Sequence, residues 1–159
     1  MTSTIDASSP NEPVIVITRM FDAPRELVWK AITDPKHVAQ WYGGQGFTNP
    51  VCEMDVRPGG IWRHIMQAPN GPQFTINSVF LEVIEPERLV WTTANDVKRN
   101  PPPPTSVTTV TLDVHGAQTK WTLVACFNSR EERDRAAQMG FGQIISQGAE
   151  RIAELLKTL

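Results

Sequence analysis

The chain has 159 residues and a formal net charge of −2, with 40% hydrophobic and 20% charged residues. Its length suits a single domain, and its composition is typical of a globular protein. No broad basic surface is available to neutralise phosphates, which disfavours nucleic-acid binding. No apolar stretch approaches the roughly 20 residues that a membrane-spanning helix needs, so we expect no membrane insertion.

The N-terminal segment MTSTIDASSPNEP has no basic stretch followed by an apolar run, which argues against a secretory signal. We expect residues 1–12 to form a flexible tail and residues 13–159 to form one domain. Cys52 and Cys126 both lie in apolar, strand-like runs. The simplest interpretation is two buried free thiols in a reducing compartment, so the predicted location is the cytoplasm; a disulfide between them is the alternative, which nothing in the sequence supports.

The first predicted elements are a strand and two helices. Residues 14–21 are rich in β-branched and apolar side chains, which favours a strand. Residues 24–33 open with a proline and carry an apolar stripe at helical spacing, which predicts a helix. Asp34 can then cap a second short helix that Pro35 opens. The glycine-rich loop at 42–46 follows a helix and lacks the Lys-Ser/Thr of a P-loop, so it does not indicate phosphate binding.

The middle of the chain predicts an antiparallel meander, because short turn-forming links join successive strands. A strand cannot continue through Pro101–Pro104, since proline donates no hydrogen bond to a sheet. We interpret this segment as a stiff surface loop; a polyproline ligand or a rim at a pocket mouth are the alternatives. The predicted strands cover 51–57, 61–67, 73–84, 88–94, 107–115 and 119–127.

The C-terminal segment predicts one long helix from about Glu131 to Leu159, because its apolar residues recur at intervals of three and four. Gly140, Gly142 and Gly148 are unusual within a helix. They suggest either a close approach to the sheet or a bend around Gly140.

The last two predicted strands alternate apolar and polar residues, so the sheet has one apolar face for the helix to cover. One helix is about 10 Å across, whereas six or seven strands span about 30 Å. The sheet must therefore curl around the helix, and we expect a cavity between them. The register of residues 73–84 stays open, because both faces carry apolar residues. The predicted pocket residues are Trp41, Trp62, His64, Met66, Phe74, Ile76, Trp91, Leu112, Trp121 and Met139.

Few residues suggest catalysis. His64 would place a donor and an acceptor among aromatic side chains, and could orient a ligand or shuttle a proton. Alternatively, it is a structural histidine bonded to backbone or water. The histidines and cysteines show no metal-ligand spacing, and no nucleophile lies beside an obvious base. We therefore predict no cofactor, no metal and no catalytic residue.

Three segments resemble the AHSA-type family, the homologues of the activator of heat-shock-protein-90 ATPase. They are FDAPRELVWKAITDPKHVAQWYG, MDVRPGGIWRHIM and EVIEPERLVWT, in the family's order. The family belongs to the START/Bet v-like superfamily, which includes polyketide cyclases and lipid-transfer proteins. The resemblance implies an α+β helix-grip fold, a curved antiparallel sheet around a long C-terminal helix, often with a hydrophobic cavity. The matching positions are Trp41, Arg57, Gly59, Gly60, Trp62, Pro86, Leu89 and Trp91.

Three functions follow from these observations. The leading one is binding of a hydrophobic or aromatic small molecule in the cavity. The second is a cyclase- or hydrolase-like enzyme that uses His64 as acid or base, and we consider it weaker because the sequence shows no partner for His64. The third is a chaperone co-factor acting through its surface on a heat-shock ATPase. A homodimer would be compatible with all three.

Overall fold

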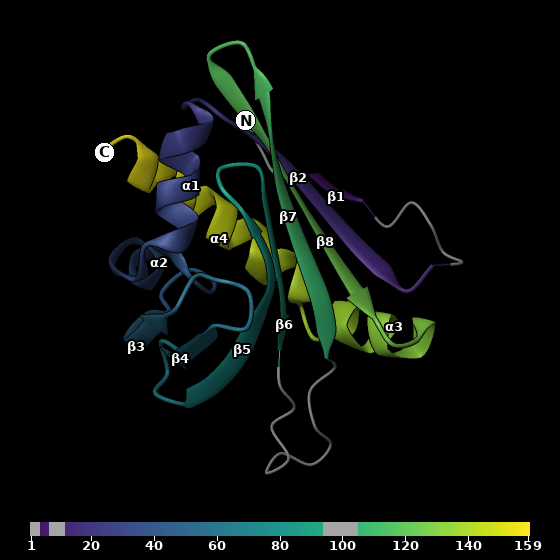
Figure 1. Cartoon of the computed structure of the whole chain (residues 1–159). Helices are drawn as coiled ribbons and strands as arrows, with labels where there is room; N and C mark the ends of the chain where they lie inside the picture. The colour runs from purple at the N-terminus through teal and green to yellow at the C-terminus, as the bar shows by residue number, and fades with distance from the viewer. Residues whose placement is uncertain (1–3, 7–11, 94–104) are drawn as a thin grey trace.

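The computed structural model describes residues 4–6, 12–93 and 105–159, and its strands form one antiparallel sheet (Figure 1). The strand order across the sheet is β1-β2-β8-β7-β6-β5-β4-β3. From β3 to β8 each strand pairs with the next in sequence, as the predicted meander requires. The strands are β1 Thr4–Asp6, β2 Val14–Phe21, β3 Thr48–Met54, β4 Ile61–Gln67, β5 Gln73–Ile84, β6 Arg88–Thr93, β7 Ser106–His115 and β8 Gln118–Phe127.

Two short helices connect β2 to β3, as the sequence predicts. Helix α1 spans Arg25–Thr33 and follows Pro24, while α2 spans Pro35–Trp41. The side chain of Asp34 accepts a hydrogen bond from the backbone N–H of Lys36, so Asp34 caps α2. In Figure 1 both helices lie beside one end of α4 (Phe141–Leu156).

The C-terminal segment forms two helices, so the prediction of one continuous helix is wrong. Helix α3 spans Arg130–Gln138, and α4 begins at Phe141. The break occurs because Gly140 adopts a φ of 88°, a left-handed conformation that ends a right-handed helix. The expected bend at this glycine is therefore a full interruption; α4 runs behind the sheet, and α3 lies at the end of β8 (Figure 1).

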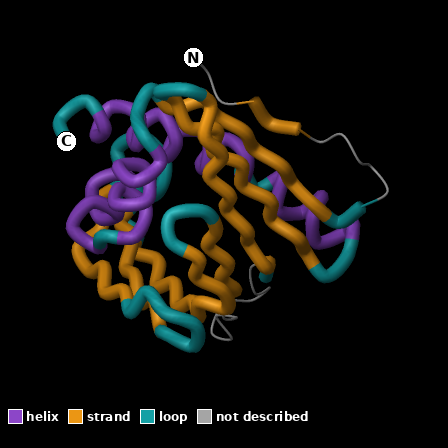
Figure 2. The backbone as a smooth tube through the Cα atoms, turned by 45° about the horizontal axis from the view of Figure 1, so that its top comes forward, coloured by secondary structure: helices purple, strands orange, loops and turns teal. Residues whose placement is uncertain are grey.

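The sheet has one buried face, and the strands curve around the helices instead of lying in one plane (Figure 2). In β8, Trp121, Leu123 and Phe127 are buried, as their alternation predicts. A register shift between Phe80 and Glu82 in β5 settles the ambiguous strand. Before this bulge the even-numbered side chains face inward, and after it Val83 packs on the core.

The N-terminal segment departs from the expected flexible tail. Thr4–Asp6 form β1 and pair with residues Thr18 to Val16 of β2 at the sheet edge. This extra strand gives eight strands within the described residues, against the six or seven predicted. The Pro101–Pro104 loop lies outside the described residues.

Candidate ligand-binding cavity

A cavity of about 430 Å³ lies between the inner face of the sheet and α4. Side chains of β4 to β8 form one wall, and residues of α4 form the other. The end of α2 and the following loop close one side through Trp41, Tyr42 and Phe47. The volume falls in the range of small-molecule pockets in proteins.

Eight of the ten pocket residues predicted from the sequence line this cavity. Met139 is 54% exposed, so it lies where the cavity meets solvent. The eight residues are Trp41, Trp62, Met66, Phe74, Ile76, Trp91, Trp121 and Met139.

The other two predicted residues, Leu112 and His64, are buried but do not line the cavity. Leu112 pairs with Trp121 across β7 and β8 and belongs to the packed core. His64 packs against the ring of Tyr42 at 4.4 Å and of Trp62 at 5.9 Å, both of which line the cavity. His64 therefore contacts two side chains of the cavity wall without lining the space itself.

His64 is held neutral by its surroundings. Its Nε2 atom lies 2.6 Å from Oδ1 of Asn49, while its Nδ1 atom is buried without a hydrogen-bond partner among the described residues. Burial lowers the pKa of His64 to about 4, because the imidazolium would lose its hydration. At neutral pH the side chain is thus an uncharged imidazole with a weakly basic nitrogen.

The aromatic wall is built around Trp62. Its ring stacks on Phe80 with centroids 5.9 Å apart and meets Trp91 edge-on at 5.5 Å. Tyr42 contacts the same ring edge-on at 5.4 Å. These rings support one another in offset and edge arrangements, which leaves their remaining faces to border the space.

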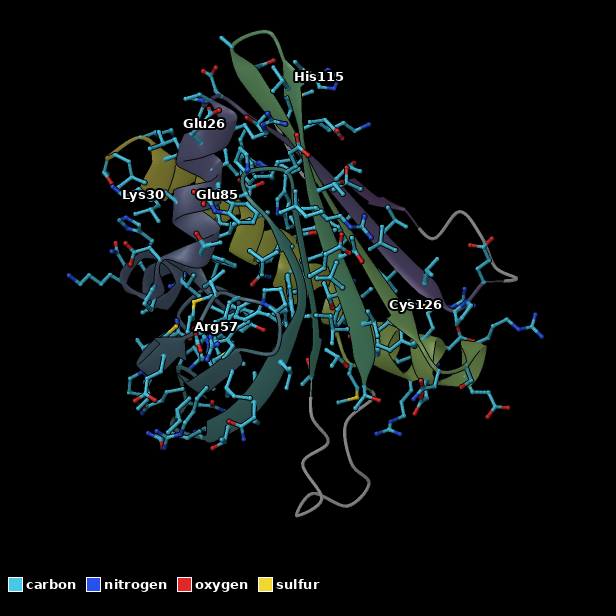
Figure 3. The ribbon with its side chains drawn as sticks, viewed as in Figure 1. Glu26, Lys30, Arg57, Glu85, His115 and Cys126 are labelled. Atoms are coloured by element: carbon cyan, nitrogen blue, oxygen red, sulfur yellow. The ribbon has the colours of Figure 1, made fainter. Side chains whose placement is uncertain are left out.

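Two neighbouring side chains also stay uncharged. Burial raises the pKa of Tyr42 to about 12, with a further contribution from the nearby Cys52. Burial raises the pKa of Cys52 to about 11, partly offset by the side chain of Trp62. Cys52 is half-buried, whereas the outward-facing Cys126 is exposed, so only one of the two thiols is even partly buried (Figure 3).

The sequence analysis did not identify three hydroxyl-bearing residues that line the cavity. Thr93, Ser106 and Thr108 line it from β6 and β7. Ser106 and Thr108 continue the inward alternation of Val110 and Leu112 towards the start of β7. Extending that two-residue period past Val110 would have identified them.

The loop that closes the cavity is anchored to α4 by two side chains. Arg151 donates hydrogen bonds to the backbone carbonyls of Gln40, Tyr42 and Gly44, at 2.6 to 3.2 Å. Gln147 accepts one from the backbone N–H of Gln45 at 2.9 Å. The guanidinium thereby satisfies carbonyls at the end of α2, where the helix leaves acceptors unpaired.

Two further groups of charged residues lie at the surface, away from the cavity. Asp55 and Arg57 form an ion pair at 2.7 Å before β4, and both side chains are exposed to solvent; Arg57 is labelled in Figure 3. A second, open hollow lies beside α1, where Glu26, Lys30 and Glu85 are neighbours in Figure 3. Over the described part of the chain, no group of histidine, cysteine, aspartate and glutamate is arranged to hold a metal ion.

Comparisons with known proteins agree with this architecture. A family model described as "Activator of Hsp90 ATPase homolog 1-like protein" matches residues 22–159. No match is found among curated proteins. Within the described residues, none of the helices has the length and apolar character to span a bilayer.

Three solved structures illustrate the similarity. A crystal structure of a protein from Nitrosomonas europaea is 28% identical, with a TM-score of 0.84 over 93% of this chain and 96% of that one. A solution structure from Arthrobacter aurescens is 22% identical, with a TM-score of 0.85 over 98% and 92%. The AHSA1 protein of Silicibacter pomeroyi is 17% identical, with a TM-score of 0.73 over 91% and 98%.

Proposed function

Since the chain belongs to the Activator of Hsp90 ATPase homolog 1-like family, with its START/Bet v-like fold, we propose that its cavity binds an apolar or aromatic small molecule. The observation that carries this proposal is the hollow between sheet and α4, whose walls are mostly aromatic and aliphatic. Burying a ligand of this character there would remove its apolar surface and that of the walls from water.

The enzymatic alternative has less support. His64 faces Asn49 instead of a carboxylate, and its lowered pKa makes it a weak base at neutral pH. It also contacts residues that line the cavity without lining the cavity itself. The chaperone co-factor alternative rests on the family description alone.

A cavity-filling variant tests the proposal. Ile145 lines the cavity from α4, so Ile145→Trp should occupy part of the space and abolish binding of a neutral fluorescent probe such as phenylnaphthylamine. Gln143→Trp is the matched control, because Gln143 is exposed on the same helix. The proposal predicts saturable binding to the unmodified protein and to the control. Absence of binding to the unmodified protein, or equal binding to all three, would contradict it.

A further inference from the structure

The described residues that line the cavity include no aspartate, glutamate, lysine, arginine or histidine. The titratable side chains nearest the space also stay neutral at pH 7. Tyr42, which lines the cavity, has a pKa of about 12, and the neighbouring His64 and Cys52 have pKa values of about 4 and 11. Arg151 of α4 already donates hydrogen bonds to three backbone carbonyls at the end of α2 and in the loop that follows it. An ionised ligand would therefore lose its hydration without gaining a counter-charge.

Several uncharged polar residues line the cavity; besides Tyr42, Thr75 and Thr105, three of them lie together on the neighbouring strands β6 and β7. Trp91 of β6 pairs with Thr108 of β7, and Ser106 lies two residues before Thr108 on the same inward face. Thr93 lies two residues after Trp91 on β6 and also lines the cavity. We name Thr93, Ser106 and Thr108 the hydroxyl patch.

The hydroxyl patch has unused hydrogen-bonding capacity. The hydroxyl oxygens of Ser106 and Thr108 lie 3.4 Å apart, longer than an ordinary O–H···O bond. Each hydroxyl can donate one hydrogen bond and accept two. Both side chains are buried, so a ligand group within hydrogen-bonding distance of both hydroxyls would supply partners that bulk water does not.

From these two observations we infer that the cavity selects uncharged ligands with an aromatic or aliphatic body and a hydroxyl or carbonyl group directed at the hydroxyl patch. The inference rests on the proposed function and specifies its ligand class. Apolar surface supplies the affinity, whereas the absence of a counter-charge excludes carboxylates, sulfonates and ammonium groups.

The first test compares two probes of nearly the same shape. Phenylnaphthylamine is neutral, and anilinonaphthalene sulfonate is the same ring system with one anionic group. We expect the sulfonate to bind at least about a hundredfold more weakly in the cavity, with Ile145→Trp defining the cavity-specific signal. Equal or tighter cavity binding of the sulfonate would overturn the inference and leave the proposed function standing. Failure of both probes to bind would instead remove the proposed function.

The second test addresses the hydroxyl patch. Thr108→Val removes one hydroxyl at nearly constant shape, and Thr109→Val does the same on the opposite face of β7, outside the cavity lining. We expect Thr108→Val to weaken naphthol binding roughly fivefold without changing naphthalene binding, and Thr109→Val to change neither. An unchanged ratio of naphthol to naphthalene affinity in Thr108→Val would show that the patch does not direct the ligand's polar group.

Discussion

Asn49 fixes the tautomer of His64. The side-chain amide of Asn49 donates to the carbonyls of Ala39 and Tyr42, at 2.8 and 3.1 Å. Its Oδ1 atom must therefore be the acceptor, and Nε2 of His64, 2.6 Å away, carries the proton. The unprotonated Nδ1 is left buried without a partner among the described residues. This arrangement has a measurable consequence for stability.

The folded protein should become less stable as the pH is lowered, because His64 resists protonation in the folded state. Its pKa is lowered from 6.5 to about 4 by burial, so the unfolded chain binds a proton that the folded chain refuses between these values. The free energy of unfolding should decrease as pH falls from 6.5 to 4, by about 3 kcal/mol from this residue. Urea denaturation at several pH values would measure it.

The matched variant for this prediction is His64→Gln, which can still donate to Asn49 but does not titrate. Carboxylates contribute equally to the pH dependence of both proteins. The difference between their unfolding free energies should therefore change by the His64 contribution alone. Parallel curves from pH 6.5 to 4 would contradict the prediction.

Arg151 should stabilise the closing loop. Arg151→Met removes the donors to three backbone carbonyls, and we expect a loss of about 2 kcal/mol together with faster exchange of a bound probe. Lys157→Met on the same segment is the control, since its pair with Glu154 is exposed and should contribute little. Chemical denaturation and stopped-flow probe release check the two effects. Equal behaviour of the two variants would show that Arg151 does not anchor the loop.

Two glycines of the C-terminal segment should respond oppositely to alanine. Gly140 has a φ of 88°, so Gly140→Ala should destabilise the protein by about 1 kcal/mol although no atom would clash. Gly148 lies within α4, where a Cβ would meet its neighbours at 3.6 Å or more, an ordinary contact. Gly148→Ala should therefore be neutral or stabilising by up to about 1 kcal/mol. Thermal unfolding compares the two variants. Equal destabilisation by both substitutions would contradict this explanation of the helix break.

Removing Glu150 from its ion pair with Arg19 should destabilise the protein more than removing Arg19. Arg19 on β2 is buried, whereas the side chain of Glu150 on α4 is 45% exposed. Glu150→Ala leaves a buried cation without its partner and should cost about 3 kcal/mol. Arg19→Met leaves a carboxylate that water can hydrate, so we expect a smaller loss in the denaturation midpoint. A larger loss for Arg19→Met would contradict this assignment of burial.

The alternation of apolar and polar residues predicted the inward face of the strands well, because the other face of the sheet is exposed to solvent. The inward faces of β4 and β8 follow directly from alternation, and so do most of the lining residues that they supply. The break before α4 was harder to predict, because apolar spacing continues past Gly140 while the backbone does not. Only the positive φ of that glycine reveals two helices.

The position of His64 could not be derived from strand alternation. Alternation correctly placed His64 on the inner face of the sheet. It does not predict whether an inward side chain reaches the cavity or is covered by its neighbours. Its ring contacts those of Tyr42 and Trp62, which line the cavity, whereas His64 does not. The hydroxyl patch was missed for a related reason, since serine and threonine do not stand out as inward residues unless the strand's apolar period is extended through them.

The most direct test of the account is where a neutral probe binds. Intermolecular nuclear Overhauser effects from bound phenylnaphthylamine should reach methyl groups of both walls, Ile145 on α4 and Val110 on β7, which line opposite sides of the cavity. Contacts to both walls at once are the predicted result. Contacts confined to exposed methyl groups, such as those of Ile61 and Val114, would contradict the claim that the hollow between sheet and helix is the binding site.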